Sequence, residues 1–159
     1  MRNTSAQQGF TLIELVIVIV VLGILAALAV PRFISLQSEA RIAVVDSLFN
    51  VVRSSSNIVY AKAAAGGVAA TATGTVDIDG ASVAGGNVAL NFGYPVATQA
   101  NLSLLFDNIS PRYNFTGGGA GGGSTLTIRI DGVPNCQITY TSPNASGSAP
   151  TIVRTVTGC

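Results

Sequence analysis

The sequence predicts an α+β fold in which one long N-terminal α-helix packs on an antiparallel β-sheet. Three observations predict it. Residues 10–30 form an apolar run, and residues 32–65 carry apolar side chains at spacings of three and four. Beyond Gly67 the chain becomes rich in Gly, Thr, Ser and Asn, with short segments that alternate between apolar and polar residues. One long helix followed by several strands is typical of a helix layer packed on a sheet layer.

The apolar run reads FTLIELVIVIVVLGILAALAV and holds one formal charge, Glu14. As a helix it is long enough to cross a bilayer core of ~30 Å. A carboxylate costs about 2.5–3.5 kcal/mol at the centre of a bilayer and less near its interface. A plain membrane anchor has no use for such a charge. We therefore expect Glu14 to meet a cationic partner, and the identity of that partner decides the function.

The first nine residues, MRNTSAQQG, are polar and precede the run. A secretory signal peptide is cut after its apolar region, and the Ala-rich step at residues 26–29 offers such a place. The apolar run is too long for that kind of signal, however, and it continues into the next helical segment without a loop. Cleavage before the run, after Gly9, is favoured. The helix would then stay on the protein as an anchor and later as the core of a polymer.

The string Gly9-Phe10-Thr11-Leu12-Ile13-Glu14, followed by an apolar stretch, is similar to the class III signal of type IV pilins. This resemblance implies that a prepilin peptidase cuts between Gly9 and Phe10 and methylates the new amino group. It also implies that Glu14 pairs with the N-terminal ammonium of a neighbouring subunit or of its own chain. That ammonium would be the cationic partner that we expect for Glu14.

Pro31 is expected to end or kink the apolar helix, because proline removes a backbone donor and clashes with the preceding turn. The helical pattern resumes at Arg32, and Gly66-Gly67 is the expected stop. From Phe10 to Ala64 such a helix would be ~80 Å long, so its N-terminal half must protrude into lipid or into a bundle of identical helices. The stripe expected to pack on the sheet comprises Phe33, Leu36, Ala40, Val44, Leu48, Val51 or Val52, Ser55, and Ile58 or Val59.

The remainder predicts a sheet of three to five strands. Strands are expected at residues 75–79, 87–92, 125–131, 136–141 and 151–156, with turns at Asp79-Gly80 and Asp131-Gly132. Thr98 is expected to cap a short helix that ends at Leu105 or Phe106. The glycine-rich residues 117–123 are low in complexity, so we expect them not to pack and to form a mobile surface loop. Sequons at Asn101, Asn108, Asn114 and Asn144 fit surface loops.

The chain has two cysteines, Cys136 and Cys159, close to its C-terminus. Beside an export-type N-terminus, an even number of cysteines predicts one disulfide in an oxidising compartment, with two unpaired thiols as the alternative. The bridge would tie the C-terminal tail to the sheet. In the chain-entropy account, it would stabilise the fold by ~3 kcal/mol.

Composition excludes several functions. The chain has no His, which removes Ser-His-Asp and Cys-His catalysis, and we expect no enzymatic activity and no cofactor. Only 9% of its residues are charged and its net charge is +1, so nucleic-acid binding is not expected. Asp77-x-Asp79 faintly resembles part of a calcium loop, which Asp107 and Asp131 could join in space. A simple hairpin turn explains the two aspartates better, and no metal site is expected.

The layout of long helix, variable connection, sheet and disulfide-bounded C-terminal loop also resembles the type IV pilin roll. Three strings look like the mannose-sensitive haemagglutinin (MSHA) pilins: Pro31-Arg-Phe33, Ile58-Val-Tyr-Ala-Lys-Ala-Ala64 and Gly93-Tyr-Pro95. The implied organisation is a cleaved leader (1–9), a transmembrane and polymerisation helix (10–31) and a globular domain (32–159). The globular domain would comprise an amphipathic helix (32–65) and a sheet region (68–159).

The resemblance implies a structural subunit of a type IV pilus, polymerising through its N-terminal helix into a surface fibre for attachment, adhesion and biofilm formation. Glu14 would register each subunit, and Leu15, Val18, Leu22 and Leu25 would form the assembly core. Expected partners are copies of this chain in a helical filament, the prepilin peptidase and the assembly machinery, then host or environmental surfaces and phage. The chain would reside in the bacterial inner membrane as prepilin and later in an extracellular pilus.

Three other functions remain open. A type II secretion pseudopilin has the same kind of N-terminus and forms a short periplasmic pseudopilus for protein secretion. An enzyme or binding protein held by an uncleaved signal anchor would form no fibres. A DNA-uptake pilin would need a basic tip, for which Arg112, Arg129 and Arg154 are few.

Overall fold

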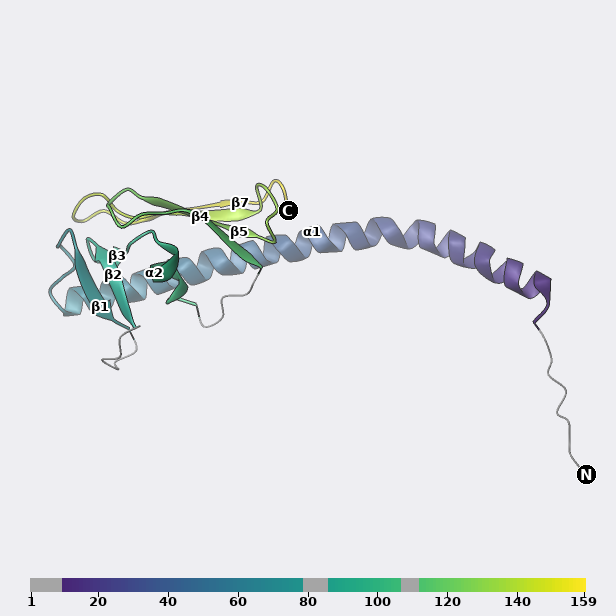
Figure 1. Cartoon of the computed structure of the whole chain (residues 1–159), viewed down its shortest axis with the longest axis horizontal. Helices are drawn as coiled ribbons and strands as arrows, with labels where there is room; N and C mark the ends of the chain where they lie inside the picture. Colours follow the sequence, from purple (N-terminus) through teal and green to yellow (C-terminus); the bar gives the residue numbers. More distant parts are fainter. Residues whose placement is uncertain (1–9, 79–85, 107–111) are drawn as a thin grey trace, which may run out of the picture. The chain divides into compact units, whose positions relative to one another are not determined.

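The computed structural model describes residues 10–78, 86–106 and 112–159, and of residues 30–35 it describes the backbone alone. These residues form a long helix α1, a short helix α2 and seven strands in two antiparallel sheets (Figure 1). The chain divides into two compact units, Met1–Ser38 and Glu39–Cys159. The expected α+β class, with one long helix and antiparallel sheet, is confirmed.

Helix α1 spans Leu12–Ala65. It does not end at Pro31, and the kink expected there stays a prediction. The stop at Gly66-Gly67 is confirmed. The backbone N–H of Val68 donates to the carbonyl of Ala63 (2.9 Å) and that of Gly67 to the carbonyl of Ala64 (3.1 Å). Gly67 has a φ of +73°, the left-handed conformation that this kind of helix cap requires.

The main sheet has four strands in the order β4-β5-β6-β7. They are β4 (Tyr113–Gly117), β5 (Thr125–Ile130), β6 (Gln137–Thr141) and β7 (Thr151–Thr155). In β5 and β6 alternate residues are buried, as the sequence pattern indicated, and Ile128 lies opposite Ile138. The turn at Asp131-Gly132 is confirmed, with φ values of +51° and +69°. Strand β4 was not predicted, although Tyr113 and Phe115 alternate with polar residues.

The main core lies between α1 and this sheet. Val45, Leu48 and Val52 of α1 pack against Leu126, Ile128, Ile130, Ile138 and Tyr140. The buried positions of α1 in this unit are 45, 48, 52, 56, 59 and 63. Of the predicted stripe, Leu48, Val52 and Val59 are therefore correct. Val44 is partly buried against the same core, and of the alternatives Ile58 and Val59 it is Val59 that is buried. Leu36 (57% exposed) and Ala40 are exposed, so their inclusion was wrong. The side chain of Phe33 lies outside the described part of the structure. Apolar residues occur on both faces of α1, and only the position of the sheet decides which face is covered.

A second, three-stranded sheet takes the order β1-β2-β3: β1 (Gly74–Asp77), β2 (Asn87–Asn91) and β3 (Tyr94–Pro95). The expectation of one sheet is therefore corrected to two. The small sheet packs Val88 and Leu90 on Val59 and Ala63, near the C-terminal end of α1, whereas the main sheet covers the earlier turns. Each sheet thus has its own hydrophobic cluster.

Helix α2 (Gln99–Ser103) begins as predicted, because the Thr98 side chain accepts from the Asn101 backbone N–H. Asn101 itself is 6% exposed, so its sequon does not lie on the surface. Its side chain accepts from the backbone N–H of Ala89 (2.8 Å) and donates to the carbonyl of the same residue (2.6 Å). The amide therefore fastens α2 to β2. Asn114 and Asn144 are exposed, and Asn108 lies outside the described residues.

The glycine-rich residues 117–123 lie at the surface, as expected, since all but Gly119 are exposed. Contrary to expectation, their backbone makes close contacts with other segments. The N–H of Gly119 donates to the carbonyl of Ala97 (2.9 Å), and Asn91 donates through its side chain to the carbonyl of Ala120 (3.0 Å). A Cβ at Gly118 would lie 2.7 Å from the Ala97 oxygen. The absence of side chains is what lets this segment approach the small sheet so closely.

Cys136 and Cys159 form the predicted disulfide, with their Cα atoms 4.8 Å apart. Cys136 is fully buried in the main core, directly before β6, and Cys159 ends the chain after β7. The bridge therefore holds the C-terminal tail to the sheet.

Candidate assembly site

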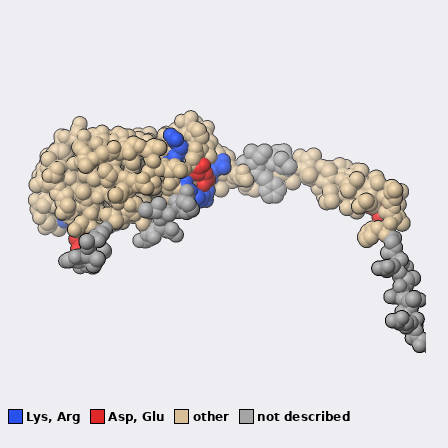
Figure 2. All heavy atoms as spheres, in the orientation of Figure 1, with Lys and Arg blue, Asp and Glu red and all other residues tan. Residues whose placement is uncertain are grey.

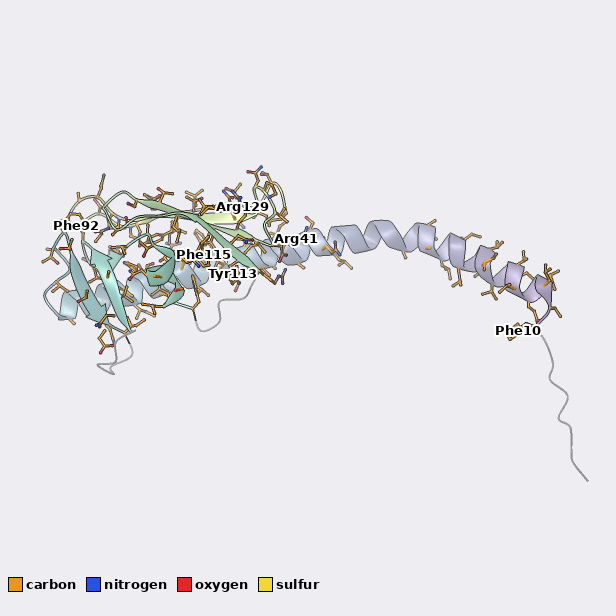
Figure 3. The ribbon with its side chains drawn as sticks, viewed as in Figure 1. Phe10, Arg41, Phe92, Tyr113, Phe115 and Arg129 are labelled. Atoms are coloured by element: carbon orange, nitrogen blue, oxygen red, sulfur yellow. A yellow bond between two sulfur atoms is a disulfide. The ribbon has the colours of Figure 1, made fainter. Side chains whose placement is uncertain are left out.

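The N-terminal part of α1 is apolar and uncovered. An 18-residue segment, Leu12–Ala29, has a mean hydropathy of 3.1 and none of its residues is buried. It is the one helix of the described residues that is long and apolar enough to cross a membrane. The side chains predicted to form an assembly core are about half exposed or more: Leu15 61%, Val18 50%, Leu22 58% and Leu25 57%. Figure 3 shows apolar side chains projecting from several sides of this segment.

Such a surface is unstable in water. Burying one large apolar side chain is worth about 1.5–3 kcal/mol, and the segment presents more than ten of them. Figure 2 shows the segment as an uncharged surface with a single acidic residue, which is Glu14. Lipid or other apolar surfaces would therefore stabilise this segment.

Glu14 and Thr11 cap the first turn of α1. The Glu14 Oε2 atom accepts from the Thr11 backbone N–H (3.0 Å) and from the Thr11 hydroxyl (2.7 Å). In return the Thr11 hydroxyl accepts from the Glu14 backbone N–H (3.3 Å). This is a capping box, in which two helix-terminal donors are satisfied reciprocally. The sequence analysis missed it, although Thr-x-x-Glu before an apolar run is the signal for it.

Phe10 lies directly before this cap and is 91% exposed. Figure 3 shows its ring beside the first turn of α1. Gly9, on the other side of the predicted cut, lies outside the described residues, so cleavage and methylation stay predictions. Only three residues separate Phe10 from Glu14, so a freed amine at Phe10 would belong to the same end of the helix as the carboxylate.

A second group of charges lies in the unit Glu39–Cys159. Arg112 donates to both carboxylate oxygens of Asp131 (2.8 Å each), and Arg41 lies 3.7 Å from the same carboxylate. The hydrogen bond from Arg112 is the largest cause that lowers the pKa of Asp131 below its ordinary value. These contacts join α1, the residue before β4 and the β5–β6 turn. Asp131 therefore has arginine partners and is not left available for calcium.

The other calcium candidates offer no cluster. Asp77 ends β1, where its backbone carbonyl accepts from the Lys62 ammonium (3.1 Å). Asp79 and Asp107 lie outside the described residues. Among the residues that are described, no three His, Cys, Asp or Glu side chains gather as a metal site would require.

Two of the strings that resemble MSHA pilins meet in space. The rings of Tyr60 and Tyr94 stack with centroids 4.5 Å apart and planes inclined by 18°. Gly93, in the turn before Tyr94, lies so close that a Cβ on it would approach Tyr60 to 2.9 Å. The contact joins Ile58–Ala64 of α1 to Gly93–Pro95 of the small sheet.

The prokaryotic N-terminal methylation motif matches residues 4–30. Similarity to the type IV major fimbrial protein FimA of Dichelobacter nodosus extends much further. The two are 34% identical over 113 residues, which cover 64% of this chain and 72% of FimA. A match over 64% of the chain is much longer than the apolar segment and therefore includes residues of the globular part.

Other relatives match over shorter stretches. The type IV narrow pilus major component PilA5 of Thermus thermophilus is 54% identical over 56 residues, 35% of this chain and 48% of PilA5. The type II secretion system core protein G of Pseudomonas aeruginosa is 55% identical over 38 residues, 24% and 27% of the two chains. The chain thus spans about half the length of PilA5 and about a quarter of core protein G. No solved structure matches it. The match to FimA covers 72% of that protein, and the uncovered apolar helix and the helix-on-sheet fold agree with it. The chain therefore belongs to the type IV pilin family.

Proposed function

We propose that this protein is a structural subunit of a type IV pilus, assembled through the apolar segment Leu12–Ala29. The observation that carries the proposal is that none of the described residues buries this segment. Membership of the type IV pilin family supplies the partner, since copies of the same helix can cover one another. In this role the protein is a building element rather than an enzyme.

Processing comes first in the proposed sequence of events. The prepilin inserts in the inner membrane through α1, and a prepilin peptidase removes residues 1–9 and methylates the amine of Phe10. The match of the methylation motif to residues 4–30 supports this step. After cleavage, the mature chain would consist of a membrane and polymerisation helix (residues 10–31) and a globular domain (residues 32–159). A kink at Pro31 would set the angle between them.

Registration depends on Glu14. In a low-dielectric surrounding, a carboxylate and an ammonium attract strongly, and an unpaired carboxylate is costly. The amine of Phe10 in a neighbouring copy would satisfy Glu14 only at one axial offset between the helices. Leu15, Val18, Leu22 and Leu25 would then pack against the neighbouring helices. Lipid already covers these side chains before assembly, so the ion pair supplies the specificity and the assembly machinery supplies the work.

The globular domain would face outward and contact host or environmental surfaces, or phage, for attachment and biofilm formation. The MSHA subfamily is the closer assignment that we propose. The Tyr60–Tyr94 stack supports it, because two of the three characteristic strings meet there. The protein would thus pass from the inner membrane to an extracellular fibre.

The second candidate is a type II secretion pseudopilin. The similarity to core protein G favours it, but this similarity covers only 24% of the chain, whereas that to FimA covers 64%. Calcium-dependent melting of the full chain would favour the pseudopilin, and melting unaffected by calcium would favour the pilin.

N-terminal mass spectrometry of the native protein tests the proposal. A chain that begins with N-methylated Phe10 is expected, and electron microscopy of sheared surface material should show fibres that contain it. A native chain that keeps residues 1–9, or one found only as single molecules, would overturn the assignment.

A further inference from the structure

Strand β7 ends the main sheet. It pairs with β6 on one side, and within the described part of the chain no strand pairs with its other side. Proteins usually prevent a free edge from pairing with another strand by placing charged side chains (above all lysine), proline or a bulge there. Strand β7 has no lysine, proline or bulge between Thr151 and Thr155, and its one charged residue, Arg154, is paired with Asp46. Four of its five residues are β-branched. Val153 is 50% exposed. This edge is therefore open to another strand.

A groove runs between this edge and α1. Its first part has a volume of about 300 Å³ and is lined by Phe49, Arg53 and Asn57 of α1 and by Pro150 and Ile152. An adjoining hollow of about 250 Å³ shares Phe49 and continues along α1 to Asp46, Asn50 and Arg154. We call the two together the α1–β7 groove.

The length of the groove suits an extended segment. From Asp46 to Asn57 the helix rises ~16 Å, at 1.5 Å per residue. Five residues of a β-strand span a similar ~16 Å. Strand β7 itself has five residues. An added strand of the same length would therefore run along both walls.

The charges of the groove are unbalanced. Arg154 forms an ion pair with Asp46 across the second hollow. Arg53 is exposed, and no ion pair joins it to a described residue. Among the described residues, the groove thus presents Arg53 as a cation without an ion-pair partner, above a floor that includes the apolar side chains of Phe49 and Ile152.

We propose that the α1–β7 groove binds an extended acidic peptide segment of a partner protein, which adds to the main sheet as a strand along β7. Backbone hydrogen bonds to the free edge hold the segment, and its alternate side chains point into the groove. A carboxylate pairs with Arg53, and the apolar side chain two residues away, on the same face of the added strand, packs on Phe49 and Ile152. This interaction does not depend on filament assembly.

Three labelled synthetic peptides test the proposal on the full, unassembled chain in detergent, by fluorescence anisotropy at low salt. The first has the sequence Val-Thr-Glu-Thr-Val, which places Glu and both Val side chains on one face. The second carries Lys in place of Glu, and the third is the first with N-methylated backbone amides. The Glu peptide should bind at least about tenfold more tightly than the other two. The Lys peptide loses the pair with Arg53, and the methylated peptide loses its backbone donors.

A charge-reversal variant gives a second readout that a folding defect cannot imitate. Arg53→Glu should bind the Lys peptide more tightly than the Glu peptide. Lys62→Glu is the matched control, because it makes the same change of charge on α1 outside the groove, and it should keep the original order.

The proposal is overturned if the Lys peptide or the methylated peptide binds as tightly as the Glu peptide, or if no peptide binds up to millimolar concentration. It is also overturned if Lys62→Glu reverses the preference between the Glu and Lys peptides. Fibre formation is scored separately, by electron microscopy of the Arg53→Glu variant, so failure of peptide binding leaves the filament proposal untouched.

Discussion

Thr11 and Glu14 hold one another at the start of α1, with the Glu14 carboxylate 2.7 Å from the Thr11 hydroxyl and 3.0 Å from the Thr11 backbone nitrogen. The single charge of the apolar segment therefore has a local task that needs no second subunit. Its proposed pairing with the amine of a neighbouring copy is an additional task. The two can be separated, because a helix cap needs a hydrogen-bond acceptor whereas pairing needs a negative charge.

Glu14→Gln keeps an acceptor for the cap and removes the charge. We expect processed monomer to remain in the membrane and little or no surface fibre to form, as with Glu14→Ala. Thr11→Val retains the charge and should still assemble, although loss of the cap costs about 0.5–2 kcal/mol of helix stability. Electron microscopy of sheared material, with immunoblots of membranes, measures both. Normal piliation of Glu14→Gln would contradict the pairing role.

The disulfide should stabilise the globular part substantially. It closes a loop with a sequence separation of 23 residues, and opening it should cost ~3 kcal/mol. Cys159→Ser is the better variant, because it leaves Cys136 as a small buried side chain in the core. Urea unfolding of the full chain in detergent, followed by near-UV circular dichroism, measures the difference. Reduced wild-type protein should match the variant, and an unchanged midpoint in both would refute the stabilising role.

The arginine cluster around Asp131 predicts a dependence of stability on pH. Because the pKa of Asp131 is lowered in the folded state, the ion pair stabilises the fold above the unfolded pKa of about 3.9. That contribution is lost as the pH falls through the folded pKa. Asp131→Asn should therefore reduce the free energy of unfolding at pH 5–8 by ~1 kcal/mol or less, and the difference should shrink below about pH 4. A difference that persists undiminished in acid would point to another cause.

Gly93 and Gly147 form a matched pair for testing the contact beneath Tyr60. Both have positive φ, +85° and +79°, so alanine is strained at either position. A Cβ at Gly93 would also lie 2.9 Å from Tyr60 and 3.0 Å from the Cα of Ala69, whereas nothing lies within 4 Å at Gly147. Gly93→Ala should lower stability by about 1–3 kcal/mol more than Gly147→Ala. Urea unfolding of the two variants measures the difference in free energy of unfolding. Equal losses of stability in both variants would mean that the small sheet shifts to accommodate the new side chain at Gly93.

Local patterns were enough to predict much of this molecule. Alternation predicted β5 and its partner β6, glycine predicted the end of α1, and Thr98 predicted the cap of α2. Two local signals were present and overlooked, namely the capping box at Thr11 and the alternation that makes β4 a strand. The disulfide followed from cysteine number and an export-type N-terminus.

For the glycine-rich residues 117–123, local reasoning correctly predicted a surface location but missed their contacts, for a physical reason. Low complexity ordinarily indicates a mobile loop, because glycine contributes no side-chain contacts. Here the backbone itself makes the contact, and Gly118 fits against Ala97 only because it has no side chain. Likewise the buried role of Asn101 depends on the position of Ala89, which lies twelve residues away in the sequence.

The sequence by itself determined the long apolar helix, its one acidic residue and the strands that follow, because hydrophobic periodicity, turn residues and charge act over a few neighbouring residues. Only the tertiary structure decided that the strands form two sheets, that Val45 is fully buried while Val44 is only partly buried against the same core, and that β7 is left with a free edge beside Arg53. Those outcomes depend on which surfaces compete for the same face of α1, and that competition is between residues far apart in the chain.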